Sequence, residues 1–200
     1  MASLYGRNNL LEFVKEAADE LFVPLAVGGG IRTADDVHAI LRAGADKVTI
    51  NTAATRRPEL INELAMRFGS ANVVVVIEAT RRQDGRYEAY TDNGRTRTGL
   101  DAIEWAGRAS ELGAGEIVIT SIDHEGTKRG FDLSLVKKVL EVVDVPVIAH
   151  GGAGTLDDVA AVAATGVDGI AIASLLHYGT ADVTTIKAHL ARCGHEVRTK

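Results

Sequence analysis

One stretch of the sequence occurs twice. "VPLAVGGGIRTADD" begins at Val23, and "VPVIAHGGAGTLDD" begins at Val145. When the alignment is extended to 32 residues, twelve are identical, among them a Gly-Gly pair, a threonine and two consecutive aspartates. The repeated unit covers a short apolar run, a glycine-rich turn, a helix-like stretch and a second apolar run. This duplication predicts a fold built from two similar halves.

Helical periodicity and short β-rich runs alternate along the chain. The predicted helices are Asn9–Leu21, Ala34–Arg42, Pro58–Phe68, Asp101–Leu112, Leu133–Val143, Leu156–Ala164 and Val183–Arg192, and a loop precedes the first of them. The predicted strands are Pro24–Val27, 47–51, 73–77, 116–120, 146–149 and 169–173. Segment 80–99 has two turn dipeptides around alternating residues, which predicts an inserted β-hairpin. Because no linker interrupts this pattern, we expect a single domain over residues 1–200.

Strands that alternate with helices of this size form βαβ units, which occur in open doubly wound sheets and in closed (β/α)8 barrels. The spacing of the repeat favours the barrel. Four strand steps separate the strand at 24 from the strand at 146, and four steps are half of an eight-stranded barrel. The predicted class is therefore α/β, a (β/α)8 TIM barrel of half-barrel repeat type with six of its eight strands in this chain. The two glycine-rich turns would face each other across one mouth.

Each glycine-rich turn offers backbone N–H groups near a helix start, an arrangement suited to phosphate. A small polar group follows one strand later in each copy, Asn51-Thr52 in the first and Ser174 in the second. Two matched sites predict an elongated substrate with a phosphate at each end. The alternative is that the glycines serve only the geometry of the turn. We interpret Asp36 and Asp158, each three residues after a threonine, as helix-capping rather than catalytic residues.

The net charge is −5, with 22 basic and 27 acidic residues, which does not indicate a general nucleic-acid binder. Cys193 is the only cysteine, so an internal disulfide is excluded and a reducing compartment is favoured. No apolar run has the length of a membrane span, and the first residues lack the apolar core of a signal peptide. We therefore expect a cytoplasmic protein. The histidines lack metal-ligand spacing, and we expect neither a metal nor an organic cofactor.

Several motifs resemble the cyclase subunit of imidazole glycerol phosphate synthase (HisF). They are "VGGGIRTADDV", "LRAGADKVTINTAA", "TGLDAIEWAGRASELGAGEIVITSIDHEGTKRGFD" and "GGAG", and the resemblance runs through essentially all 200 residues. It implies a half-barrel-symmetric (β/α)8 fold and a lyase of histidine biosynthesis. That reaction joins ammonia to a bisphosphorylated ribulosyl nucleotide and forms imidazole glycerol phosphate and aminoimidazole carboxamide ribotide. The resemblance also implies a glutaminase partner (HisH-like) that sends ammonia through the barrel.

The resemblance assigns roles to particular residues. The residues expected to hold one phosphate are Gly30, Asn51 and Thr52. The residues expected to shape the other phosphate site are Glu125, Gly126, Gly152, Ala173 and Ser174. Thr120 would line the substrate site. Lys47 and Glu116 match two members of the ammonia gate, although their position alone indicates solvated charges at strand starts.

Some positions depart from the family pattern. The family has a catalytic aspartate at the end of its third strand, where this chain has Glu78. We expect Glu78 to act as general acid/base from about one methylene further out, and a displacement of about 1 Å can lower a rate ~100-fold. The alternative is that Glu78 only hydrogen-bonds a neighbour. Asp123 could contribute from another strand end, and His150 could donate to a phosphate or simply pack. Tyr87 and Trp105 are expected to pack.

The other departure concerns what comes before the first helix. The family has two strands there, which carry its other catalytic aspartate and a substrate-binding lysine. We therefore expect unpaired edge strands near 24–27 and 169–173 and little cyclase activity from these 200 residues alone. Two alternative functions remain: a HisF-like ammonia-channelling partner in the amidation of surface-polysaccharide sugars, and a non-catalytic phosphate-binding fragment.

Overall fold

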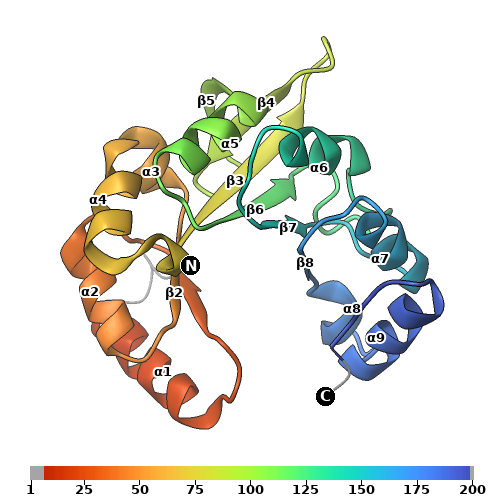
Figure 1. Cartoon of the computed structure of the whole chain (residues 1–200), viewed down its shortest axis with the longest axis horizontal. Helices are drawn as coiled ribbons and strands as arrows, with labels where there is room; N and C mark the ends of the chain where they lie inside the picture. The colour runs from red at the N-terminus through yellow and green to blue at the C-terminus, as the bar shows by residue number, and fades with distance from the viewer. Residues whose placement is uncertain (1–6, 199–200) are drawn as a thin grey trace. The chain divides into compact units, whose positions relative to one another are not determined.

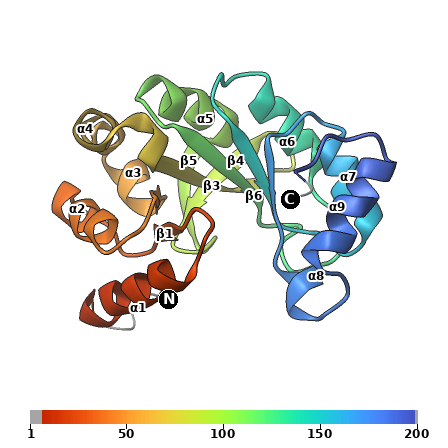
Figure 2. The same ribbon diagram turned by 60° about the horizontal axis from the view of Figure 1, so that its bottom comes forward.

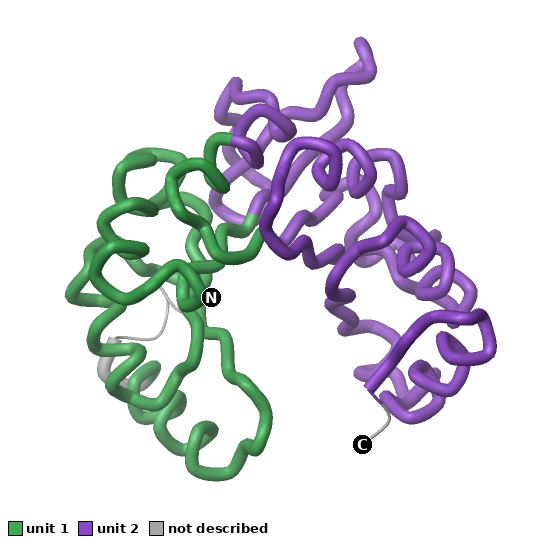
Figure 3. The backbone as a smooth tube through the Cα atoms, viewed as in Figure 1, with its two compact units in different colours: residues 1–76, 108–117 green, residues 77–107, 118–200 purple. Residues whose placement is uncertain are grey.

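The computed structural model describes the backbone of residues 7–198 and the side chains of residues 10–198. Residues 1–6, where the sequence predicts a loop, lie outside the described residues. The chain forms two compact units, residues 1–76 with 108–117 and residues 77–107 with 118–200 (Figure 3). The boundary passes through strands β3 (Val73–Arg81) and β6 (Glu116–Ser121), so each unit contains part of both strands.

The main sheet has the strand order β1-β2-β3-β6-β7-β8 (Figure 1). In the first unit, β1 (Ala26–Gly28) and β2 (Lys47–Ile50) pair in parallel, and β2 pairs in parallel with the start of β3. In the second unit, β7 (Val147–His150) and β8 (Gly169–Ala171) also pair in parallel. Helices connect these strands, so the α/β class and the half-barrel order of a (β/α)8 fold are confirmed.

The predicted helices are all present. The longer ones are α1 (Arg7–Glu20), α2 (Ala34–Arg42), α4 (Glu59–Phe68), α5 (Ala102–Glu111), α6 (Leu133–Leu140), α7 (Leu156–Ala163) and α9 (Val183–Arg192). A 3-10 turn, η1 (Ser70–Asn72), precedes β3. In the second unit α7 and α9 pack side by side (Figure 2), and His189 of α9 lies 3.1 Å from the carboxylate of Asp157 on α7.

Several strand predictions were wrong at their ends. The first strand begins at Ala26 rather than Pro24, and proline has no N–H to donate to a sheet ladder. The strands predicted to reach 51 and 173 stop at Ile50 and Ala171. After them, Asn51 and Ala173 leave the extended conformation, with ψ of −81° and −60°, and single-turn helices follow. These are α3 (Thr52–Arg56) and α8 (Ser174–His177), and neither was predicted.

The two copies of the repeat make the same helix caps. Thr33 accepts a hydrogen bond from the N–H of Asp36 at 3.2 Å, and the Asp36 carboxylate accepts one from the N–H of Thr33 at 3.0 Å. Thr155 and Asp158 repeat this capping box with distances of 3.1 and 2.8 Å. The interpretation of both aspartates as capping residues is confirmed.

A second shared contact ties the strand after each helix to the strand before that helix. The Asp46 carboxylate accepts a hydrogen bond from the N–H of Leu25 at 2.7 Å. In the second copy, the Asp168 carboxylate accepts one from the N–H of Val147 at 2.9 Å. Identical residues in the two copies therefore make identical contacts, which means that the sequence repeat is also a structural repeat.

The segment predicted as an inserted β-hairpin forms an antiparallel extension of the main sheet. Strand β3 continues to Arg81 and pairs antiparallel with β4 (Tyr87–Thr91), which pairs with β5 (Thr96–Asp101). Tyr87 anchors this extension, because its buried hydroxyl donates to the Asp132 carboxylate at the start of α6, at 3.0 Å. Tyr87 and Trp105 are 1% and 6% exposed, which confirms that they pack.

Candidate functional site

The second glycine-rich turn is covered by the loop that follows β6. The N–H of Gly130 donates to the carbonyl of Gly152 at 2.9 Å, and Nδ1 of His124 donates to the carbonyl of Gly130 at 2.7 Å. A Cβ on Gly152 would lie 2.1 Å from that Gly130 oxygen, so only glycine allows the approach. A Cβ on Gly151 would meet the Cα of Glu125 at 3.4 Å. The structure thus brings the predicted residues of the 125–126 loop next to the second turn.

The first glycine-rich turn is different. Gly29 and Gly30 have φ of 106° and 70°, as the repeat requires, but a Cβ on Gly30 would meet no atom within 4 Å among the described residues. The turn leads from β1, and β2 leads to Asn51 and Thr52 at the start of α3. Because β1 and β2 pair in parallel, both segments leave the same end of the sheet in the first unit. Among the described residues, the first turn therefore has the predicted neighbours but no covering loop like that of the second turn.

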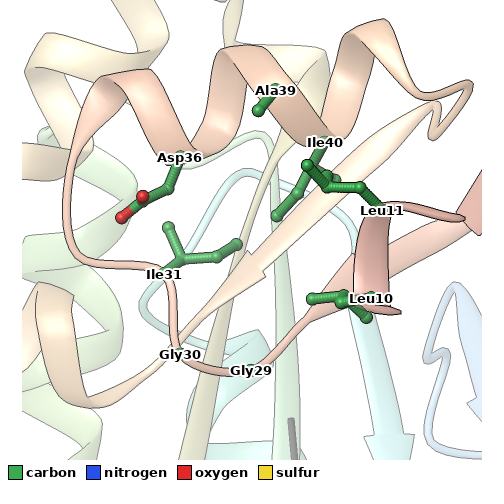
Figure 4. Close-up of a pocket in the computed structure, with 8 residues that line it drawn as sticks. All are labelled: Leu10, Leu11, Gly29, Gly30, Ile31, Asp36, Ala39 and Ile40. Atoms are coloured by element: carbon green, nitrogen blue, oxygen red, sulfur yellow. The ribbon is translucent and has the colours of Figure 1, made fainter. Parts of the chain in front are cut away.

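A pocket lies beside the first turn (Figure 4). The residues that line it are Leu10, Leu11, Gly29, Gly30, Ile31, Asp36, Ala39 and Ile40. Leu10 and Leu11 come from α1 and Ile40 from α2, so most of the lining is apolar (Figure 4). The carboxylate of Asp36 is committed to the helix cap and would repel an anion. We therefore assign no phosphate to the pocket itself and keep the backbone of the turn as the candidate anion site.

Glu78 lies where β3 passes into the antiparallel extension, opposite Tyr90 of β4. Its Oε2 accepts a hydrogen bond from the N–H of Gly94 at 3.1 Å. Gly94 belongs to a turn in which Asp92, Asn93 and Gly94 have φ of 54°, 58° and 72°. The inserted segment thus contributes a backbone donor to the candidate catalytic carboxylate. Sequence reasoning missed this contact, although the Asn93-Gly94 dipeptide marked the turn.

Thr120 and His150 meet at the ends of β6 and β7. The Thr120 hydroxyl lies 3.1 Å from Nδ1 of His150, and Thr120 is only 3% exposed. This pair was not predicted, because spacing in the sequence does not show which strand-end side chains share a face. Asp123, a weaker candidate, accepts a hydrogen bond from the N–H of Arg81 at 2.8 Å and so fastens the end of β3.

Lys47 and Glu116 form an ion pair within the first unit. They are the first residues of β2 and β6, and the strand order places β3 between these strands. Their side chains are 27% and 20% exposed. The interpretation as separate solvated charges is therefore wrong, because the two residues reach each other across β3. The pairing fits the gate residues implied by the resemblance, but the role in ammonia passage stays a prediction.

A buried carboxylate in the extension was also missed. Glu88 of β4 is 4% exposed and accepts hydrogen bonds from Arg82, Arg97 and the N–H of Gly99 at 2.6, 2.9 and 3.0 Å. The hydrogen bond from Arg97 is the main reason why the pKa of Glu88 lies below its usual range. This network holds β4 and β5 together, and we assign it a structural role.

Two features are absent from the part of the chain that the structure describes. No set of three histidine, cysteine, aspartate or glutamate side chains there could hold a metal ion. No helix there is long and apolar enough to cross a membrane.

Comparison with known proteins places this chain in a family. A family model described as "Histidine biosynthesis protein" matches residues 1–182. The imidazole glycerol phosphate synthase subunit HisF of Legionella pneumophila is 58% identical over 158 residues, which are 79% of this chain and 74% of that protein. The chain belongs to the HisF family. HisF of Beutenbergia cavernae is 48% identical over 202 residues, and HisF of Corynebacterium diphtheriae is 46% identical over 204 residues. Each of these two matches covers 79% of the relative.

The match to HisF proteins includes all the candidate residues, because the longer alignments cover 98–99% of this chain. The family resemblance is therefore confirmed. The role of each individual residue stays a prediction.

Proposed function

We propose that this chain is the cyclase of imidazole glycerol phosphate synthase, the lyase that forms imidazole glycerol phosphate and aminoimidazole carboxamide ribotide. Identity of 46–58% to proteins named as HisF is the observation that carries the proposal. The same names favour this function over sugar amidation and over a non-catalytic fragment. The carboxylate of Glu78, the backbone N–H groups of the two turns and Thr120 at the end of β6 supply chemistry that suits this reaction.

The two glycine-rich turns are the proposed anchors for the two phosphates of the substrate. Gly30 with Asn51 and Thr52 would hold one phosphate. The second group consists of Glu125, Gly126, Gly152, Ala173 and Ser174. Backbone N–H groups in positive-φ turns suit anions because they carry partial positive charge without a bulky side chain. This explains how a chain with a net charge of −5 can bind a bisphosphate.

Glu78 is the proposed general acid/base. Addition of ammonia to a carbonyl carbon removes a proton from nitrogen and delivers one to oxygen, and a positioned carboxylate can carry out such transfers. The hydrogen bond from Gly94 restrains the rotation of the Glu78 carboxylate. Thr120, at the end of β6, would line the same substrate site from its neighbouring strand.

The proposed ammonia source is a glutaminase subunit of the HisH type. Relatives are named as subunits, which supports a partner. Lys47 and Glu116 lie at the starts of their strands, whereas the phosphate turns follow strand ends. An ion pair at the opposite end of the strands suits a gate for ammonia that arrives from the far side. We propose the cytoplasm as the compartment.

The test is a Glu78→Gln substitution made in the native host. Gln keeps the hydrogen bond from Gly94 but cannot take up a proton, so we expect a requirement for histidine and a cyclase rate at least ~100-fold lower in the protein as purified from that host. Glu78→Asp, which keeps the acid, should preserve growth without histidine. Unimpaired growth and an unchanged cyclase rate in the Gln variant would overturn the assignment.

A further inference from the structure

The two turns differ at the residue that precedes each Gly-Gly pair. In the first copy this residue is Gly28, and in the second copy it is His150. Gly28 pairs with Thr49 of β2, and a Cβ on Gly28 would lie 1.8 Å from the Thr49 hydroxyl oxygen. His150 pairs with Ala171 of β8, the position equivalent to Thr49. The first copy therefore has no room for a side chain at the position of Gly28. In the second copy His150 and Ala171 replace Gly28 and Thr49, which places an imidazole beside a small residue.

The contact with Thr120 favours one tautomer of His150. Thr120 is buried, so its hydroxyl proton needs an acceptor, and the nitrogen at 3.1 Å is Nδ1 of His150. A neutral imidazole that accepts at Nδ1 carries its proton at Nε2. His150 is half-buried at the end of β7, and its backbone leads directly into Gly151 and the second turn.

The other histidine near the second turn has the opposite arrangement. Nδ1 of His124 donates to the carbonyl of Gly130 at 2.7 Å, so its neutral ring leaves Nε2 as an acceptor. An acceptor nitrogen repels a phosphate oxygen, whereas a donor attracts it. Of these two rings, only that of His150 offers an N–H to an anion while it is uncharged.

We propose that His150 is a phosphate-binding residue that makes the second turn different from the first. Its Nε2–H donates to a phosphate ester held by the backbone of Gly151 and Gly152, and Thr120 is a positioning residue that sets the tautomer. The first turn, with Gly28 at the equivalent place, has backbone donors alone. The proposal rests on the proposed phosphate sites and adds the means by which the protein distinguishes the two ends of its substrate.

The test uses the whole chain, labelled with ¹⁵N, and two probes, inorganic phosphate and glycerol phosphate. The amide signals of Gly152 and Gly30 report each turn separately, and a long-range imidazole spectrum reports the tautomer of His150. His150→Asn keeps a polar group near Thr120 but has no Nε2. Loss of one hydrogen bond to an anion should weaken phosphate binding at Gly152 about tenfold or more and leave Gly30 unchanged.

Three further variants separate the proposed role from general damage. Thr120→Val removes the hydroxyl and should shift His150 toward the Nδ1–H tautomer with weaker binding at Gly152, and Thr120→Ser should restore both. His38→Asn changes a histidine of the first unit that stacks on Phe68, and it should alter neither signal.

The outcomes are distinguishable. Equal phosphate affinity at Gly152 in the wild type and in His150→Asn, or an Nδ1–H tautomer in the wild type, overturns the role of His150 and leaves the proposed function standing. Absence of any response at both turns in the wild type overturns this proposal together with the proposed phosphate sites.

Discussion

At the scale of single residues, the structure shows how a charge can be buried in a small β extension. Glu88 pairs with Arg97 and Arg82, whose guanidinium groups stay largely in solvent, while the carboxylate itself is 5% exposed. Burial of a carboxylate is unfavourable unless its oxygens are hydrogen-bonded, and here both oxygens are. Glu88 is therefore a better candidate for a structural acid than the exposed carboxylates of the chain.

We predict that Glu88→Gln destabilises the protein by about 2 kcal/mol at pH 7, because hydrogen bonds to a buried charge are lost. The pKa of Glu88 in the folded state lies below its ordinary value of 4.5, so the stabilisation is complete above pH 4.5. It is lost as the pH falls through the lower, folded-state pKa. Urea unfolding between pH 7 and pH 3 should show the wild type and the variant converging at acid pH.

The matched control for this measurement is Glu63→Gln. Glu63 also pairs with an arginine, Arg57 at 3.0 Å, but its side chain is 45% exposed. Exposed ion pairs contribute little, so this variant should change stability by less than about 1 kcal/mol at pH 7. Equal losses in the two variants would contradict the role given to Glu88.

At the scale of helices and strands, the repeat produces matched elements in the two units. The caps of α2 and α7 use the same residue types with hydrogen bonds that agree within a few tenths of an ångström. The strand after each helix is tied by an aspartate to the strand before it. These local contacts depend on short spacings in the sequence, which is why the capping boxes could be predicted from it.

Thr33→Ala and Thr155→Ala should each destabilise their own helix by about 1 kcal/mol, since each removes one side-chain acceptor from a helix start. The two losses should agree within about 0.5 kcal/mol because the geometry is matched. Native-state amide hydrogen exchange of α2 and α7 measures each helix separately. Thr184→Ala, on the exposed face of α9, is the control and should be nearly neutral. A loss confined to one copy would show that the caps are not equivalent.

At the scale of the whole molecule, the central prediction is that the two turns hold one ligand. The strand count of the repeat predicts turns on opposite sides of one barrel mouth. The structure describes each turn within its own unit, and their opposition across a common site stays a prediction. Binding measurements can test this prediction directly, because a ligand that contacts both turns should bind more tightly than a ligand that contacts only one.

We expect a bisphosphate of substrate length to bind at least ~100-fold more tightly than glycerol phosphate, because the second phosphate binds at high effective concentration. Isothermal titration calorimetry at fixed ionic strength measures this ratio. A bisphosphate too short to span the mouth is the control and should bind like the monophosphate. Equal affinity for the long bisphosphate and the monophosphate would refute a shared site.

Sequence reasoning located most elements and many candidate residues, but it misjudged contacts between distant segments. The position of Lys47 and Glu116 alone indicated solvated charges, yet the two residues pair across β3. It also missed the donor that Gly94 brings to Glu78, because that contact depends on how β4 and β5 fold back onto β3. These two contacts join residues 16 and 69 positions apart, which meet only because the strand pairing places them together.

The sequence by itself determined the α/β alternation, the half-barrel repeat, the capping boxes and the positions of the glycine-rich turns. All of these follow from periodicity and from contacts a few residues apart. Only the tertiary structure decided which strand-end groups meet: Thr120 with His150, Gly94 with Glu78, and the 124–130 loop with Gly152. The physical reason is that strand pairing and register set these distances, and hydrogen bonds form only when both partners arrive on the same face.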